Sequence, residues 1–148
     1  MNFRTAQQAL NQYRSVAVEA GASANPHRLV QLLLVGGLDR IARARGALER
    51  GDCSAKGSNI GAALDIVTVL RGNLNLSQGG ALAANLAALY DYMIRCLLEA
   101  NRANDAGKLD EVAALVGQIK AGWDGIAAEV HPLEVHPPAV RPPEVRPL

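Results

Sequence analysis

Aromatic side chains make up only 3% of this 148-residue sequence, which also contains just two cysteines. Cys53, expected in a loop, and Cys96, expected within a helix, do not have the spacing of a metal site, so we expect reduced thiols. The chain lacks an uninterrupted apolar run of the roughly 18 residues that span a bilayer, and its first ten residues are too polar for a secretory signal. These absences predict a cytoplasmic protein that does not insert into a membrane.

A strong charge of either sign is absent as well. Lysine and arginine together number 15 against 14 aspartate and glutamate residues, which gives a formal net charge of +1. Because no overall field attracts nucleic acid, we expect no nucleic-acid partner. With 49% hydrophobic and 20% charged residues, the composition is that of one globular domain with a substantial core.

The residue patterns of common enzyme sites are missing too. A di-metal site in a helical bundle needs Glu-x-x-His pairs, but only His27 precedes the tail and no acidic residue lies three positions before it. We expect His27 to face solvent or to cap its helix instead. Gly36-Gly37 and Gly79-Gly80 lack the strand and lysine of a phosphate loop, and Cys96 has no histidine partner. We therefore predict no catalysis, no metal site and no cofactor.

Four long segments have helical periodicity, at about 26–50, 54–75, 79–104 and 109–129. The third segment has two adjacent apolar rows, which is typical of the central member of a bundle. These rows are Leu82, Leu86, Leu89, Met93 and Leu97, and beside them Ala83, Ala87, Tyr90, Ile94 and Leu98. The fourth segment has one apolar face, made of Leu109, Val112, Leu115, Val116, Ile119, Trp123 and Ile126, with Trp123 expected in the core.

Capping residues and glycines mark the ends of these helices. Asn25 followed by Pro26 predicts the start of the first long helix, and Ser54 is the expected N-cap of the second. Residues 75–80 and 104–108 are expected to be connections. Gly36-Gly37 lies inside the first long helix, where each glycine costs on the order of 1 kcal/mol. This pair indicates either close packing against a neighbouring helix or a concave spot that a bound helix touches.

The two ends of the chain have different patterns. Residues 1–20 predict a short, weakly amphipathic helix, either a plain first helix or a movable flap whose Tyr13 packs on a groove. From His131 onward a degenerate five-residue repeat rich in proline predicts an extended tail, either solvated or a docking peptide. The predicted fold is all-α, an antiparallel four-helix bundle with an additional short N-terminal helix in residues 1–129, followed by a disordered Pro-rich tail in residues 130–148.

Several fragments resemble, in the same order, those of the flagellar secretion chaperone (FliS) family. The signature is Leu89-Tyr90-Asp91-Tyr92-Met93, followed by Leu97-Leu98 and Ala100-Asn101. The other fragments are Tyr13, Asn25-Pro26-His27-Arg28-Leu29-Val30-Gln31-Leu32-Leu33 with Gly36, Gly51-Asp52 with Ala55-Lys56-Gly57, Gly79-Gly80, Asn104-Asp105 and Trp123. Together they cover nearly everything before the tail.

This resemblance implies a cytosolic export chaperone that binds the disordered C-terminal segment of flagellin. Such a chaperone prevents premature polymerisation and supports delivery to the flagellar type III export apparatus. The implied partners are that flagellin segment and a component of the export gate, and a homodimer is a further expectation. The residues that match the family motifs, and so are predicted to bind the client, are Tyr13, Leu29, Leu32, Leu33, Gly36, Tyr90, Tyr92, Met93 and Leu97.

Two questions stay open from the sequence. Tyr90 and Tyr92 lie about 200° apart on a helix, so we expect one in the core and the other facing the client. The small side chains that leave a groove for a client also permit a second interpretation, in which another copy of the chain fills the groove. That would give a client-free helical oligomer with a structural role. The ordered family fragments favour the chaperone.

Overall fold

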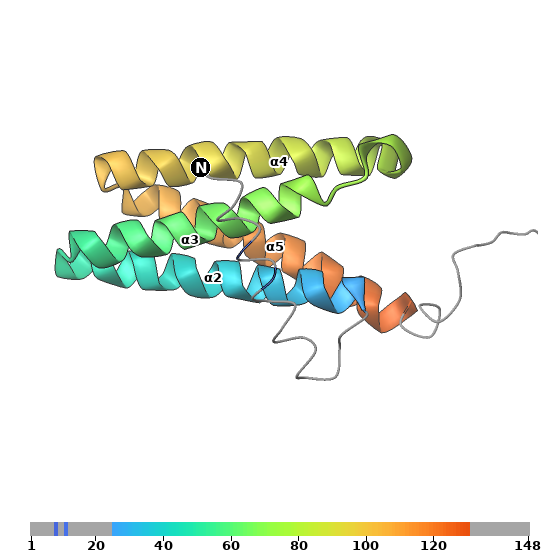
Figure 1. The fold of residues 1–148 in the computed structure, drawn as a ribbon, viewed down its shortest axis with the longest axis horizontal. Coiled ribbons are helices and arrows are strands. Elements are labelled where there is room, and N and C mark those ends of the chain that lie inside the picture. Colours follow the sequence, from blue (N-terminus) through green and yellow to red (C-terminus); the bar gives the residue numbers. More distant parts are fainter. Residues whose placement is uncertain (1–7, 9–10, 12–24, 131–148) are drawn as a thin grey trace, which may run out of the picture.

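Four antiparallel helices form a bundle in the computed structural model, which describes residues 8, 11 and 25–130. The helices are α2 (Pro26–Arg50), α3 (Cys53–Gly72), α4 (Leu76–Ala103) and α5 (Ala106–Val130). They run alternately up and down, and each packs against its two neighbours in the order α2, α3, α4, α5 (Figure 1). The predicted four-helix bundle is therefore confirmed.

The expected start of α2 is confirmed, whereas the expected cap of α3 is wrong. Asn25 Oδ1 accepts hydrogen bonds from the backbone N–H groups of His27 at 2.9 Å and Arg28 at 3.3 Å. Gly51, at φ 75°, ends α2 in the left-handed conformation. The N-cap of α3 is Asp52, whose side chain accepts from Ala55 N at 3.1 Å, and not Ser54. The connection is only two residues long, so the cap comes directly after the terminating glycine.

The other two connections are shorter than expected. α4 begins at Leu76, so helical structure extends into the segment predicted as a connection, and a non-helical residue, Gly80, then kinks it. α5 begins at Ala106, inside the second predicted connection, and Asp105 Oδ1 accepts from Lys108 N at 3.2 Å. Cys53 lies at the first position of α3 and not in a loop, and it is exposed; Cys96 is buried in α4 as expected.

The core lies along the axis of the bundle and draws on all four helices. α2 approaches α3 at Gly37, where an added Cβ would lie 3.6 Å from Ile66 Cγ2, which is an ordinary contact distance. Both glycines of the Gly36-Gly37 pair are buried, which favours the close-packing interpretation. The largest fully buried side chains are Leu33, Leu34, Ile41, Ile60, Ile66, Val67, Met93, Leu97, Leu109, Val112 and Val116.

Within the described part of the chain, one helix segment, Gly79–Ala103, is long and apolar enough to cross a membrane by length and composition alone. The core helix of a soluble protein meets the same criterion, and this segment packs against α3 and α5 with Tyr90, Met93 and Leu97 buried. Two side chains of its predicted apolar rows are nevertheless exposed, Leu82 at 67% and Leu98 at 54%. The two rows therefore give α4 a wide buried face that does not include these two leucines.

Three expectations concern residues outside the described part of the chain. These are the additional N-terminal helix, the packing of Tyr13 and the extended Pro-rich tail. They stay predictions from the sequence.

Candidate binding groove

A hydrogen bond from Tyr92 to Glu111 identifies the faces of α4 and α5 that meet. Tyr92 Oη donates to Glu111 Oε2 at 2.5 Å. Because the two helices are antiparallel, counting backward along α4 and forward along α5 from this bond leads to the same end of the bundle. Side chains three or four residues apart share a helix face. The rows that follow are Leu89, Leu86 and Leu82 on α4, and Leu115, Ile119 and Ile126 on α5; we call them the α4/α5 groove.

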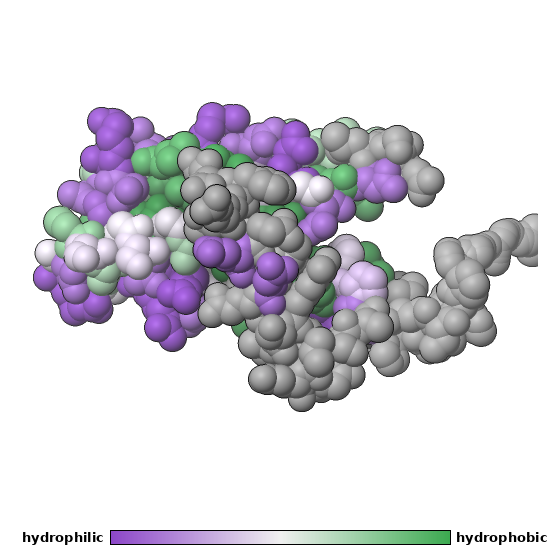
Figure 2. All heavy atoms as spheres, viewed as in Figure 1, coloured by the Kyte–Doolittle hydropathy of each residue, from purple (hydrophilic) through white to green (hydrophobic). Residues whose placement is uncertain are grey.

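The two rows separate toward the end of the bundle where α4 begins and α5 ends, which we call the open end. Leu86, Leu89, Leu115 and Ile119 are half-buried against the core, whereas Leu82 is 67% exposed and Ile126 is 42% exposed. α4 and α5 have the sparsest packing of the four neighbouring pairs. Figure 2 shows the molecule hollowed at this end, with hydrophobic surface on both sides of the hollow. The groove therefore presents apolar surface that no other helix among the described residues covers.

Two glycines shape the start of α4. Gly80 has φ 59° and ψ −139°, a conformation that side chains rarely tolerate. A Cβ on Gly79 would lie 2.4 Å from Ala83 Cβ, far inside any normal contact. Both positions therefore require glycine, and the bend at Gly80 sets the direction in which the segment carrying Leu82 leaves the connection.

On the opposite side of the open end, His27 and Trp123 hold α2 to α5. Their rings stack with centroids 4.6 Å apart and planes 14° from parallel. Trp123 Nε1 donates to the His27 backbone oxygen at 3.0 Å, and His27 Nε2 lies 3.1 Å from the Trp123 backbone oxygen. Because a carbonyl oxygen only accepts, His27 Nε2 must carry a proton. His27 thus packs against a neighbouring helix, which corrects the expectation of a solvent-facing or capping role.

A second polar contact reinforces the same pair of helices. Gln31 Nε2 on α2 donates to Asp124 Oδ1 on α5 at 2.7 Å, and Lys120 Nζ donates to Asp124 Oδ2 at 2.6 Å. The hydrogen bond from Lys120, and then the one from Gln31, lowers the pKa of the Asp124 carboxyl. In contrast, the Tyr92–Glu111 bond is the one side-chain hydrogen bond between described residues of α4 and α5. The α2/α5 side is thus fastened near the open end, and the α4/α5 side is not.

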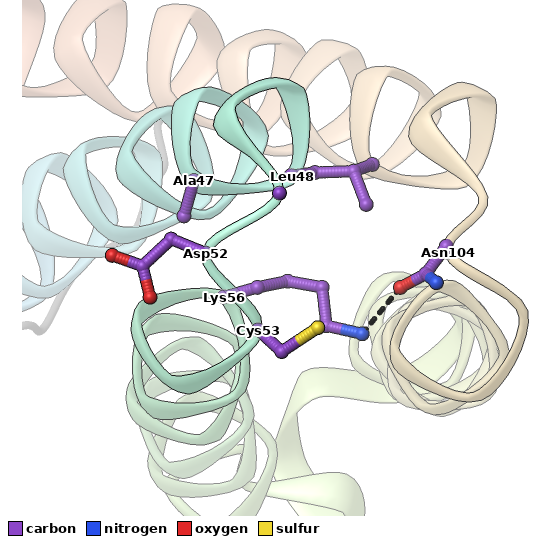
Figure 3. Close-up of a pocket in the computed structure, with 7 residues that line it drawn as sticks. Ala47, Leu48, Asp52, Cys53, Lys56 and Asn104 are labelled. Atoms are coloured by element: carbon purple, nitrogen blue, oxygen red, sulfur yellow. Dashed lines mark hydrogen bonds between the residues drawn. The ribbon is translucent and has the colours of Figure 1, made fainter.

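The far end of the bundle is closed by a buried lysine. Lys56, only 7% exposed, donates to the Asn101 backbone oxygen at 2.9 Å and to Asn104 Oδ1 at 2.5 Å. Figure 3 shows it reaching from α3 to the corner between α4 and α5, beside a recess of about 50 Å³ that Cys53 also lines. This contact gives a structural reason for the Lys56 and Asn104 fragments seen in the sequence.

The structure separates the predicted client-binding residues into two groups. Leu33, Gly36, Tyr90, Met93 and Leu97 are buried in the bundle, whereas Leu29, Leu32 and Tyr92 are half-buried. Leu29 and Leu32 lie on the first turns of α2, at the open end. Tyr13 lies outside the described residues. The part of these residues in client binding stays a prediction.

A client groove was predicted from the sequence, but its place between α4 and α5 was not. Its six side chains were all predicted, but as inward-facing rows of the third and fourth helices, because an open row and a buried row have the same periodicity. The available signal was the pair Gly79-Gly80, which sets the direction in which α4 starts just before Leu82. Among the residues described, no three His, Cys, Asp or Glu side chains gather to hold a metal ion.

Comparisons with known proteins identify relatives of this chain. The sequence model of the family "Flagellar protein FliS" matches residues 6–130. The flagellar secretion chaperone FliSB of Pseudomonas aeruginosa is 54% identical over 123 residues, which are 82% of this chain and 98% of that protein. The flagellar secretion chaperone FliS of Vibrio cholerae is 39% identical over 126 residues, 84% of this chain and 93% of that protein.

Four antiparallel helices, with an apolar groove that no other described helix covers, define a helical bundle with one open apolar face. Together with the match along most of its length, this shows that the chain belongs to the FliS family. Its relatives are flagellar secretion chaperones, and a chaperone role is not an enzymatic one.

Proposed function

We propose that this protein is a cytosolic export chaperone for flagellin, and that the α4/α5 groove holds part of flagellin's disordered C-terminal segment. The observation that carries the proposal is the apolar face left uncovered at the open end, with Leu82 67% exposed and Ile126 42% exposed. A groove of this kind takes up an amphipathic helix through apolar side chains at positions i, i+3, i+4 and i+7.

The binding step couples folding of the client to its burial. A disordered segment that becomes helical in the groove loses conformational entropy on binding, so its affinity per unit of buried area is modest. This suits a chaperone that must later release its client. While it is bound, the apolar face of the segment is unavailable to other flagellin subunits, so polymerisation in the cytosol is prevented.

Release belongs to the flagellar type III export apparatus in this proposal. A component of the export gate is the second partner, and it receives the chaperone together with its client. The protein acts through binding alone, without a cofactor and without catalysis.

The test uses the C-terminal peptide of the flagellin encoded in the same genome. Calorimetry measures its affinity for the protein, and circular dichroism measures the helicity of the peptide on binding. The groove variant is Leu82→Asp. Because Leu82 is already exposed, the change should leave the free energy of unfolding within about 0.5 kcal/mol of its original value. We expect one-to-one binding with a gain of helix, weakened at least tenfold by Leu82→Asp because a charge replaces an apolar contact.

Leu98→Asp is the matched control. Leu98 is an exposed leucine on the same helix, 54% exposed, but it lies roughly 160° around the helix from Leu82 and toward the closed end. It should leave peptide binding unchanged. If the two variants weaken binding equally, the groove is not the site. If the protein binds no peptide and instead forms a dimer that Leu82→Asp dissociates, the client-free oligomer is correct.

A further inference from the structure

Glu111 is a charged side chain at the inner end of the α4/α5 groove, which is the end away from the open end of the bundle. Its carboxylate accepts the hydrogen bond from Tyr92 that joins the two helices. On α5, Leu115 lies one turn after Glu111, and on α4, Leu89 lies one turn before Tyr92. The bond therefore adjoins the last pair of apolar side chains in the groove. Because Glu111 is exposed, a client that occupies the groove can reach its carboxylate.

Only one oxygen of the Glu111 carboxylate is hydrogen-bonded within the described residues. Tyr92 Oη donates to Oε2, whereas the nearest cation to Oε1 is Lys108 Nζ at 3.9 Å, a distance too long for a hydrogen bond. The other cation nearby is Arg95, whose Cζ lies 5.7 Å from the centre of the Tyr92 ring. Lys108 precedes Glu111 on α5 and Arg95 follows Tyr92 on α4, so both lie toward the closed end. Toward the groove, the carboxylate has no cation among the described residues.

The rest of the groove is uncharged along its described side chains. α4 has no Asp, Glu, Lys or Arg from Leu76 to Tyr90. On α5, Lys120 and Asp124 bond to each other, and Asp124 also accepts from Gln31 of α2, so this pair belongs to the α2/α5 side. The exposed residues that accompany the apolar rows are otherwise small residues or amides. Glu111 is thus the one charge that the described side chains place at the groove.

We infer that the client helix places a basic side chain, Lys or Arg, against Glu111, and uncharged side chains along the rest of the groove. The inference rests on the proposed function, because the client is the occupant of the α4/α5 groove. The long stem of a basic side chain can cover apolar surface at Leu89 and Leu115 while its charged head reaches the carboxylate. An acidic side chain at the same place would be repelled. Apolar contacts therefore supply affinity, and the charge at one end fixes the register of the client helix.

The variant Glu111→Gln tests this inference and preserves the end of the groove. The amide oxygen of glutamine can still accept the hydrogen bond from Tyr92, so the melting temperature should stay within about 2 °C of the original value. Calorimetry with the C-terminal flagellin peptide should show a roughly threefold loss of affinity, which is the size expected for an exposed ion pair. Raising the salt concentration from about 50 mM to about 500 mM should weaken the original complex more than that of the variant, because salt screens the pair.

Asp39→Asn is the matched control for the change in net charge. Asp39 is an exposed carboxylate that pairs with Arg43 at 2.9 Å on α2, a helix that does not line the groove. Its replacement should leave the peptide affinity unchanged. An equal loss of affinity in both variants would show that only the net charge of the protein matters, and would overturn the inference.

A double-mutant cycle identifies the basic residue of the client. Each Lys and Arg of the peptide is changed in turn to Met and titrated against the original protein and against Glu111→Gln. One position should lose roughly threefold in affinity with the original protein and nothing with the variant. If Glu111→Gln binds the peptide as tightly as the original protein, or if no basic position couples to Glu111, the inference is wrong and the proposed function stands. Absence of any peptide binding would instead remove the proposed function.

Discussion

Single side chains fasten α2 to α5 at one half of the open end. The stacked rings of His27 and Trp123 exchange hydrogen bonds with each other's backbone, and Gln31 and Lys120 meet at Asp124. His27 and Trp123 are 96 positions apart in the chain, and Gln31 and Asp124 are 93 apart, so no local pattern predicts these contacts between α2 and α5. On the other half, the Tyr92–Glu111 bond stops short of the groove. Among the described residues, the α2/α5 side of the open end therefore has polar contacts between its helices, and the α4/α5 side does not.

Asp124 predicts a specific loss of stability in acid. Its pKa is lowered in the folded state, first by Lys120 and then by Gln31, so its contribution is present above the unfolded pKa of about 3.9 and is lost as the pH falls through the folded value. As the pH is lowered below about 4, the melting temperature of Asp124→Asn should therefore fall less than that of the original protein. Thermal melts across this range measure it.

Lys120→Met supplies the second variant for that experiment. It removes the largest cause of the lowered pKa while keeping a side chain of similar length, so it should flatten the same part of the profile. If both variants follow the original curve throughout, the Asp124 cluster does not contribute to the pH dependence.

At the scale of the helices, local chemistry accounts for most starts and stops. The start of α2 follows from Asn25 and Pro26, and its end follows from Gly51. The start of α3 was predicted at the wrong cap, since Ser54 and Asp52 are both good capping residues and only the position of Gly51 decides between them. The first turn of α4, which begins at Leu76, was not predicted from the sequence. The pair Gly79-Gly80 predicts a connection there, and a single helical turn before it leaves no recognisable pattern.

Gly80→Ala should be costly because Gly80 is in a conformation nearly restricted to glycine. We expect a loss of about 1–3 kcal/mol in the free energy of unfolding, measured by urea denaturation. Gly117→Ala is the matched control, because an added Cβ there meets nothing within 4 Å and the site is in a regular helix. It should leave stability unchanged or raise it by about 0.5–1 kcal/mol. Equal effects at the two positions would show that the kink does not require glycine.

At the scale of the molecule, the buried side chains of the bundle lie between Leu33 and Val116, and the last helix ends at Val130. A chain ending at residue 130 should therefore keep the melting temperature and the peptide affinity of the full-length protein. Differential scanning calorimetry and peptide titration of both chains check this. A clear loss of either property would mean that the Pro-rich segment packs on the bundle, and the division into residues 1–129 and 130–148 would be wrong.

The all-α class, the number of described helices and most of their bounds were predictable from the sequence, because helix periodicity and caps depend on neighbours within a few residues. Only the tertiary structure decided which apolar rows are covered. Leu97 and Leu82 belong to one row of the same helix, yet Leu97 is fully buried and Leu82 is 67% exposed. The burial of a side chain on α4 depends on where α5 packs beside it and on the direction that the kink at Gly80 gives to the start of α4. Both are decided by packing between segments that are distant in the sequence, which periodicity does not record.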